Sequence, residues 1–423
     1  MKDTLRLGRR VVGGFAIGRA QRLEPGHSLL VVGPTQVGKT SSLVIPSILS
    51  WPDALVVTSV KRDVVAATVP WRAALGHVQV LDPGAPDGLT WDPLEGVATM
   101  RDALRVARDL TLRSSGHGDT EFWNTLAVKL LGALFVRAVE RGLTIVDVAL
   151  VLESRDLETW SDDPSSVAAR VIADFLAHET RTIDGVITTA ETMLLPWRFD
   201  QPRARVRSVV DGAHTLYLCS PRGEQAHYQS LFAGALRGVL DEQQRRVDRA
   251  TARPLLLVLD EAAVVAPLDE LDELAATLAG LSVTLITVVQ DFAQLVARWG
   301  PRAPTIVNNH ATRLVMAGLS DPTAATYVPE VAPSIHPSTP SGPSRASRTR
   351  PAPSLRERPR GTALVVAGNH RPVTIRLRPW WRDSRLRARG GPASAPGYSM
   401  GVNDWSGPAT AGTGPRARSL GWR

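Results

Sequence analysis

A glycine-rich stretch that contains a lysine and a hydroxyl is the most chemically specific part of this sequence. It matches the pattern G-x-x-x-x-G-K-[ST] without departure and reads Gly33, Pro34, Thr35, Gln36, Val37, Gly38, Lys39, Thr40. Such spacing lets backbone N–H groups surround a phosphate, and the next helix adds the positive end of its dipole. Lys39 would then reach the β- and γ-phosphates, and the Thr40 hydroxyl would bind Mg²⁺. Together with Ser41, the stretch predicts a site for ATP and Mg²⁺, whereas a simple glycine turn would leave the lysine unexplained.

Two adjacent carboxylates follow the most strand-like run in the chain. Residues 254–259 are proline and five apolar residues, and Asp260 and Glu261 come directly after them. A P-loop needs an acidic partner at the end of a neighbouring strand. We expect Asp260 to hold Mg²⁺ through water and Glu261 to act as general base on the attacking water. The alternative is that the pair only caps a helix.

Other polar residues near strand ends give weaker signals. Gln290 follows the apolar run Val283–Val289, where a γ-phosphate sensor would sit, and Arg313 precedes a short strand. Arg313 could be an arginine finger that reaches a neighbouring subunit, or it could form a surface salt bridge. Lys61 and Asp63 come at the end of a second strand. They could lie near the expected nucleotide, or they could pair with each other on a solvated turn. The histidines show no metal-ligand spacing and are interpreted as structural or surface residues.

The composition is that of a globular protein that can bury a large core. The chain has 423 residues, of which 43% are hydrophobic and 21% charged. These proportions exclude a disordered, collagen-like or polytopic membrane protein. The single cysteine, Cys219, excludes an intramolecular disulfide and a multi-cysteine metal site. The apolar runs Leu255–Leu259 and Val283–Val289 are too short to span a bilayer, so the sequence predicts no transmembrane segment and a cytoplasmic protein.

Positive charge is concentrated near the C-terminus. The net charge is +8, and residues 341–423 hold sixteen arginines and no lysine against three acidic residues. The rest of the chain is therefore mildly acidic. Arginines in the tail would suit phosphate contacts and salt-dependent DNA binding. An equally open alternative is a solvated tail whose arginines reflect a GC-rich genome.

Short apolar strands alternate with helices around the P-loop, which predicts an α/β fold with a parallel-rich central sheet. Residues 101–205 lack convincing strands and contain strong helical patterns, so they are expected to form an inserted all-α domain. The α/β domain then comprises residues 27–100, 206–332 and 361–381. Residues 1–26 form an N-terminal segment, residues 333–360 a Pro/Ser/Arg-rich loop, and residues 382–423 a basic flexible tail.

The motifs, taken in order, resemble the coupling-protein ATPases of type IV secretion and conjugation, the TraG-like family within the FtsK/HerA class. Seven stretches carry the resemblance: GPTQVGKT, VVTSVKRD, GDTEFWNTLAVKLLGALF, LLLVLDEAA, ITVVQDFAQLVARWG, NNHATRLVMAGLSDP and ALVVAGNHRPVTIRLRPWWRD. The resemblance implies a RecA-like P-loop ATPase with an inserted all-α domain. It also implies Gln290 as γ-phosphate sensor and Arg313 as an arginine acting in trans.

The same resemblance implies partners. These are DNA, single-stranded and joined to a relaxase, the other subunits of the secretion channel, and further copies of the chain in a homo-hexamer. The family usually begins with transmembrane helices, whereas this chain reaches its P-loop strand by His27. Contact with the inner face of the cell membrane would then come through partners or a missing anchor. Relatives also have a basic, glycine-containing stretch after Asp-Glu-Phe, and this chain has residues 262–267, AAVVAP, instead.

Several functions stay open at this point. The leading hypothesis is an ATP-driven coupling protein that recruits and pumps DNA or a relaxase–DNA conjugate. An FtsK/HerA-type pump for double-stranded DNA and a secretion ATPase with protein cargo are alternatives of the same enzyme class. A non-hydrolysing, nucleotide-gated docking subunit is an alternative of another class. Such a subunit would tolerate loss of Lys39 or Glu261, and both are present.

Overall fold

The computed structural model describes residues 5–391 except 13–14, 24–25, 61, 84, 86–88, 112–118, 199–201, 221–222, 224, 266–267, 321, 324–326, 328–355 and 357. The expected loop at 333–360 lies mostly outside these residues, as do Lys61 and the part of the expected tail after residue 391.

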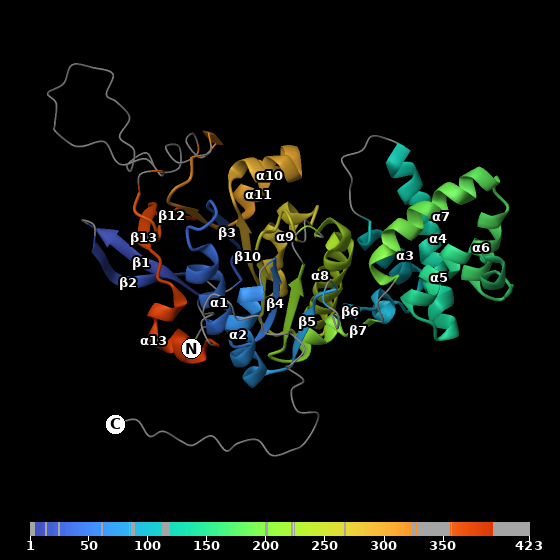
Figure 1. Cartoon of the computed structure of the whole chain (residues 1–423), viewed down its shortest axis with the longest axis horizontal. Helices are drawn as coiled ribbons and strands as arrows, with labels where there is room; N and C mark the ends of the chain where they lie inside the picture. The colour runs from blue at the N-terminus through green and yellow to red at the C-terminus, as the bar shows by residue number, and fades with distance from the viewer. Residues whose placement is uncertain are drawn as a thin grey trace, which may run out of the picture.

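The described residues form one large mixed sheet, in the order β2-β1-β13-β12-β11-β3-β10-β9-β4-β8-β5 (Figure 1). From β11 to β5 neighbouring strands are parallel, and from β11 to β2 they are antiparallel. The strands are β1 Leu5–Val12, β2 Phe15–Leu23, β3 Leu29–Val32, β4 Ala54–Ser59, β5 Val78–Leu81, β8 Thr215–Cys219, β9 Leu255–Leu259, β10 Val283–Val289, β11 Thr312–Met316, β12 Thr362–Ala367 and β13 Val373–Arg376. The expected parallel-rich α/β sheet is confirmed.

Helices cover both faces of this sheet. The helical turn Thr40–Val44 runs directly into α1 Ile45–Ser50. The other helices are α2 Arg62–Leu75, α8 Gln225–Asp248, α9 Leu271–Thr277, α10 Phe292–Trp299, α11 Ala303–Asn309 and α13 Ser384–Arg389. Strands β3, β4, β9 and β10 are buried along their whole length. That burial explains their continuous apolar, β-branched sequences, because a parallel sheet is covered on both faces.

A group of helices lies beside the sheet, at one end of the molecule (Figure 1). It consists of α3 Met100–Asp109, α4 Asp119–Arg141, α5 Ile145–Ser154, α6 Val167–Leu176 and α7 Thr180–Leu194, bracketed by the short paired strands β6 Thr90–Trp91 and β7 Pro202–Ala204. The central helix α4 packs against the other four. The pair β6–β7 was not expected from the sequence, because two or three residues are too few to show a strand period.

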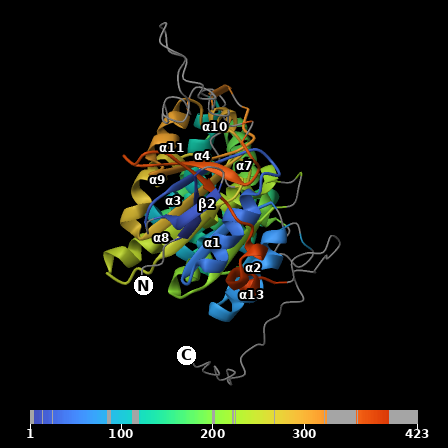
Figure 2. The same ribbon diagram turned by 90° about the vertical axis from the view of Figure 1, so that its left-hand side faces the viewer.

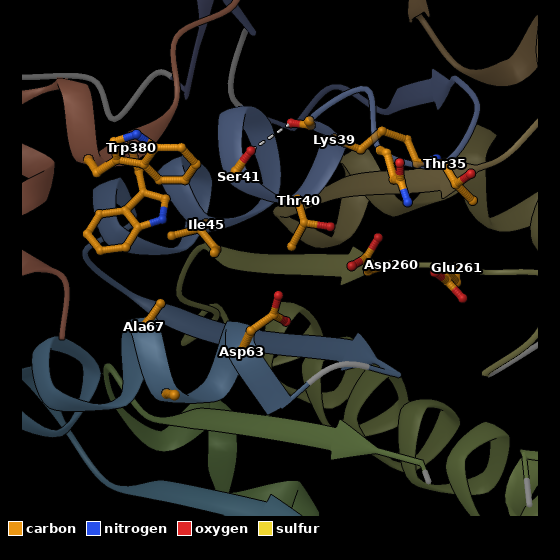
Figure 3. A pocket seen from close by; sticks show the side chains of 14 residues that line it. Thr35, Lys39, Thr40, Ser41, Ile45, Asp63, Ala67, Asp260, Glu261 and Trp380 are labelled. Atoms are coloured by element: carbon orange, nitrogen blue, oxygen red, sulfur yellow. Dashed lines mark hydrogen bonds between the residues drawn. The ribbon is translucent and has the colours of Figure 1, made fainter. Parts of the chain in front are cut away.

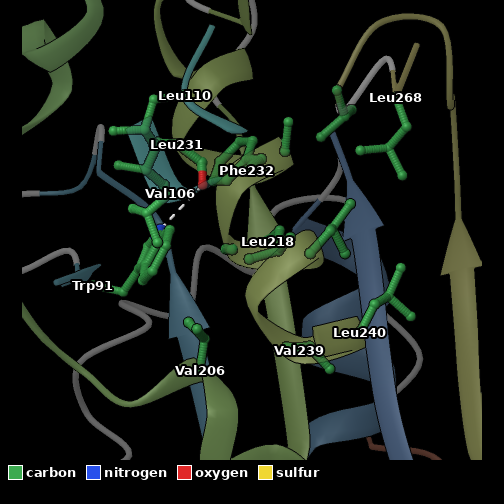
Figure 4. Close-up of a cluster of buried hydrophobic side chains, with 14 of the residues drawn as sticks. Trp91, Val106, Leu110, Val206, Leu218, Leu231, Phe232, Val239, Leu240 and Leu268 are labelled. Carbon is green, nitrogen blue, oxygen red and sulfur yellow. Dashed lines mark hydrogen bonds between the residues drawn. The ribbon is translucent and has the colours of Figure 1, made fainter. Parts of the chain in front are cut away.

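Alternate residues of each buried strand face two different cores. Leu30 and Val32 belong to the larger core and Leu29 and Val31 to the smaller one on the opposite face. The larger core continues through α8 into the helical group (Figure 4). There the Trp91 indole donates a 3.0 Å hydrogen bond to the Leu231 carbonyl on α8.

Among the described helices, α4 is long and apolar enough over Glu121–Arg141 to cross a membrane by length and composition. The sequence predicts an amphipathic to buried helix here and no transmembrane segment. The most apolar window of α4 has a mean hydropathy of 1.4, and 56% of that window is buried inside the protein. This burial against the neighbouring helices accounts for its apolar composition.

Both ends of the described chain contain elements that the sequence did not predict. Strands β1 and β2 fall in residues expected to be a plain N-terminal segment, and they extend the sheet through β13. Helix α13 falls in residues expected to be a flexible tail, and it contacts α1 and α2 (Figure 2).

Candidate functional site

The glycine-rich loop connects β3 to the helical stretch at Thr40, as the sequence predicts. Gly38 has a φ of +92°, a conformation that L side chains rarely adopt. Gly33 lies against the next strand, since a Cβ built on it would be 2.7 Å from the Cβ of Met316. Two glycines of the motif are therefore required by the backbone conformation and by close packing.

Lys39 is buried, with 9% of its surface exposed. Its ammonium group donates hydrogen bonds to the carbonyls of Gly33 and Pro34, the latter at 2.9 Å. The side chain therefore folds back over the loop, where its charge lies beside the loop's own backbone. An anion bound in the loop would meet both the ammonium group and the N-terminus of the following helix.

The carboxylate pair follows β9, two strands away from β3 with β10 between them. Asp260 is 4% exposed, and the Thr58 hydroxyl donates a 3.2 Å hydrogen bond to its backbone carbonyl. Glu261 has a φ of +55°. A positive φ is uncommon for residues other than glycine and is found preferentially at functional sites. The turn is held by bonds from the N–H groups of Val264 and Val265 to the Glu261 carbonyl, at 2.9 and 3.2 Å.

The loop and the carboxylates line one pocket of about 580 Å³ (Figure 3). Its walls also include residues of α1, of α2 and of the segment after β13. The lining residues are Thr35, Gln36, Gly38, Lys39, Thr40, Ser41, Ile45, Asp63, Ala66, Ala67, Asp260, Glu261, Trp380 and Trp381. The volume lies in the range of small-molecule and cofactor sites.

The pocket contains the oxygen donors that Mg²⁺ prefers. The Thr40 hydroxyl and the Asp260 carboxylate both face it (Figure 3). Within the described residues, no group of three or more His, Cys, Asp or Glu side chains could hold a metal ion. This arrangement fits Mg²⁺, which usually binds through one or two protein oxygens together with substrate phosphates and water.

Gln290 lies next to the pocket but is not one of its lining residues. It follows β10, and the preceding residue, Val289, accepts a 3.3 Å hydrogen bond from the N–H of Gly33. The Gln290 backbone N–H donates a 2.9 Å hydrogen bond to the side-chain oxygen of Gln294. Gln290 thus follows the strand that lies between the P-loop strand and the carboxylate strand.

The structure does not bring Arg313 to the pocket of its own chain. Arg313 pairs with Leu30 near the start of β11, and Met316, which contacts the P-loop, comes three residues later. Three residues of a strand correspond to about 10 Å.

His310, which lies near Arg313 in the sequence, is fully buried, with ring nitrogens 2.7 Å from the Ile306 carbonyl and 2.9 Å from the Thr287 hydroxyl. Burial, assisted by the nearby Arg313 charge, lowers the pKa of His310 to about 4.

The far wall of the pocket was not predicted from the sequence. Trp380 and Trp381 line it together with Ile45, Ala66 and Ala67. The two adjacent tryptophans in PWWRD were the available signal, but the sequence gives no reason to connect them with a loop more than 300 residues earlier. Asp63, which the sequence left undecided, also faces the pocket.

The chain is similar to known proteins in sequence and in fold. The family model described as type IV secretory system conjugative DNA transfer matches residues 4–332. A conjugal transfer protein TraG of Escherichia coli is 24% identical over 316 residues, which are 65% of this chain and 49% of that protein. The chain therefore spans about half the length of this curated relative.

Solved structures show the same fold. The plasmid coupling protein TrwB in complex with the non-hydrolysable ATP analogue ADPNP superposes with a TM-score of 0.61 at 18% identity, covering 84% of this chain and 86% of that one. TrwB in complex with ADP and Mg²⁺ gives a TM-score of 0.60 at 17% identity, covering 88% and 89%. These matches confirm the RecA-like P-loop fold with an added helical part. With most of its length matched by the family model, the chain belongs to the type IV secretory system conjugative DNA transfer family.

Proposed function

We propose that this protein is an ATP-hydrolysing coupling protein that recruits DNA, or a relaxase–DNA conjugate, and moves it toward a type IV secretion channel. The observation that carries the proposal is the meeting of the P-loop with Asp260 and Glu261 in one pocket. The family match and the nucleotide complexes of TrwB support it.

The proposed roles follow from the positions of the side chains. Backbone N–H groups of residues 35–41 and the Lys39 ammonium group bind the phosphates of ATP. Thr40 and Asp260 would hold Mg²⁺, which would supply positive charge beside the phosphate oxygens. Glu261, at the open end of the carboxylate turn, accepts the proton of the attacking water. Gln290 senses the γ-phosphate, because the residue before it, Val289, is hydrogen-bonded to Gly33, the first residue of the P-loop.

Arg313 acts, in this proposal, on the pocket of a neighbouring subunit. Its position near the start of β11, about 10 Å back from the P-loop edge, leaves its own pocket out of direct reach. Its Nε is buried and has no hydrogen-bond partner within the described part of the chain. A ring of six subunits, with residues 101–205 as an inserted all-α domain, would place nucleotides at subunit boundaries and DNA in a central pore.

A second, strongly basic cleft supports DNA as a partner. It has a volume of about 580 Å³ and lies between the β1–β2 hairpin, α1 and the segment around α13. Eight arginines line it, against the single carboxylate of Asp383: Arg6, Arg9, Arg22, Arg376, Arg378, Arg382, Arg385 and Arg389. Arginine forks bind phosphate oxygens in bidentate geometry. Anchoring at the inner face of the membrane, through other channel subunits, completes the proposal.

Steady-state ATP hydrolysis by the purified protein tests this function. The assay is run without DNA and with single- or double-stranded DNA, at about 50 and about 200 mM salt. We expect hydrolysis that DNA stimulates and that salt suppresses, with most activity lost in Lys39→Ala. Lys129→Ala is the matched control, because Lys129 is exposed on α4, away from the pocket. Nucleotide binding without turnover in an assembled oligomer would instead favour a docking subunit.

A further inference from the structure

The nucleotide pocket has two chemically different ends. Asp260 and Glu261 lie at one end, and Lys39, Thr40 and Ser41 lie in the middle (Figure 3). The opposite end is walled by Ile45 of α1, by Ala66 and Ala67 of α2, and by Trp380 and Trp381. The side chains of this second wall contain no hydrogen-bond acceptor. A ligand whose phosphates occupy the middle therefore extends its remaining part over an apolar, aromatic surface.

The aromatic wall is fixed to the helices that carry the P-loop and the alanines. The Gly391 N–H donates a 2.9 Å hydrogen bond to the Ala67 carbonyl on α2. The Arg389 guanidinium donates to the Leu49 carbonyl on α1 at 2.9 Å and lies 4.4 Å from the centre of the Trp71 ring. The segment after β13 is thus bound to both helices and forms a built part of the pocket.

The two tryptophans differ in exposure. Trp380 is 4% exposed and packs into the smaller core. It leaves no room for a side chain at residue 390, since a Cβ built on Gly390 would lie 2.1 Å from its ring. Trp381 is 43% exposed, and its ring centre lies 6.0 Å from that of Trp380 at an interplanar angle of 81°. Trp380 therefore supports an aromatic ring that is itself open to the pocket.

We propose that Trp381, backed by Trp380, is a stacking platform for the purine base of the nucleotide. This inference rests on the proposed function of the pocket as a nucleotide site. Aromatic rings and bases stack without regard to base identity, because every base has a π-face. Because the wall offers no side-chain acceptor, adenine and guanine nucleotides bind with similar affinity. Both tryptophans lie beyond residues 4–332, so the family match does not assign this role.

Calorimetric titration of the full chain in Mg²⁺, with ADP, GDP and tripolyphosphate as ligands, tests the platform. Loss of one base–aromatic stack corresponds to a roughly 5- to 150-fold higher Kd. We expect Trp381→Ala to raise the Kd for ADP and the Kd for GDP by the same factor within that range, and to leave the Kd for tripolyphosphate unchanged. Trp381→Phe keeps an aromatic face and should retain most of the affinity. Phe122→Ala, which removes a 56% exposed ring on α4, is the matched control.

Each of the other outcomes overturns the inference in a different way. If Trp381→Ala binds ADP like the wild type, the base does not lie on Trp381. If the variant loses tripolyphosphate as well as ADP, Trp381 maintains the shape of the P-loop and is not a base platform. If the wild type binds tripolyphosphate and ADP equally well, the base makes no contact with the wall. If the wild type binds none of the three ligands, the proposed function of the pocket fails as well.

Discussion

Arg72 gives the sharpest test of how the wall of the pocket is held in place. It belongs to α2, the helix that carries Asp63, Ala66 and Ala67, and it is completely buried. Its guanidinium donates to the Thr215 hydroxyl at 2.7 Å and to the carbonyls of Trp51, Asp53 and Ala213 at 2.5, 2.6 and 3.2 Å, respectively. These bonds tie α2 to the turn before β4 and to the start of β8.

The magnitude for Arg72→Met follows from these contacts. Four hydrogen bonds at about 1 kcal/mol each would cost about 4 kcal/mol, since the buried carbonyl of Trp51 and the part-buried carbonyls of Asp53 and Ala213 all lose a donor. Burial of the guanidinium, which lowers the pKa of Arg72, works in the opposite direction because the variant no longer desolvates a charge. We therefore expect a loss of about 2–4 kcal/mol in local stability.

Amide hydrogen exchange measured by mass spectrometry is the suitable assay, because it reports on α2 and β8 separately from the helical group. The expected loss corresponds to roughly 30- to 1,000-fold faster exchange in peptides covering α2. Arg155→Met is the control, since its 2.9 Å ion pair with Asp184 is about half exposed on both sides and contributes little. Exchange in Arg72→Met that matches the control would refute the reasoning.

Three further predictions concern the P-loop, a buried histidine and the basic cleft. Gly33→Ala should lower nucleotide affinity at least about tenfold, because its Cβ would lie 2.7 Å from Met316 Cβ, and Met316→Ala should restore part of it in a titration. The lowered pKa of His310, about 4, means that the unfolded chain binds the proton more readily. Stability to urea should therefore fall as pH decreases from about 6.5 toward 4, by up to about 1.4 kcal/mol per pH unit, and His310→Asn should flatten this slope. The double variant Arg378→Ala, Arg385→Ala should weaken single-stranded DNA binding and reduce the slope of log K against log salt by about 1.4, measured by fluorescence anisotropy. An unchanged salt slope would place the DNA elsewhere.

The chemical centre of the site could be predicted from the sequence because its signals are local. The spacing of Gly33, Gly38 and Lys39 and the apolar run before Asp260 each lie within a few residues. A parallel sheet then brings the ends of such runs to one edge without further information. This rule placed the P-loop and the carboxylates together, and it also placed Gln290 beside them.

The rest depended on contacts between distant residues or on interrupted patterns. Strand β1 alternates Leu5 and Leu7 with exposed arginine, but its register with β2 shifts between Arg6 and Gly8 and again between Arg9 and Arg10. Such irregularities break the period of two on which strand prediction relies.

The aromatic wall and Arg313 show the same limit at the site itself. No local pattern connects Trp381 with the P-loop, because the path of the chain along β13 brings the two into one pocket. Arg313 was expected to precede a strand, but it lies within β11, and its register with Leu30 determines its distance from the pocket.

The most direct test of the central claim is the comparison of ATP hydrolysis and ATP binding in Glu261→Gln. The substitution keeps the size of the side chain and removes the base, so we expect turnover to fall about 10²- to 10⁴-fold while the Kd for ATP changes little. Glu121→Gln, an exposed substitution on α4, should have no effect on either quantity. Undiminished hydrolysis in Glu261→Gln would contradict the account, because Glu261 would then not be the general base that we propose.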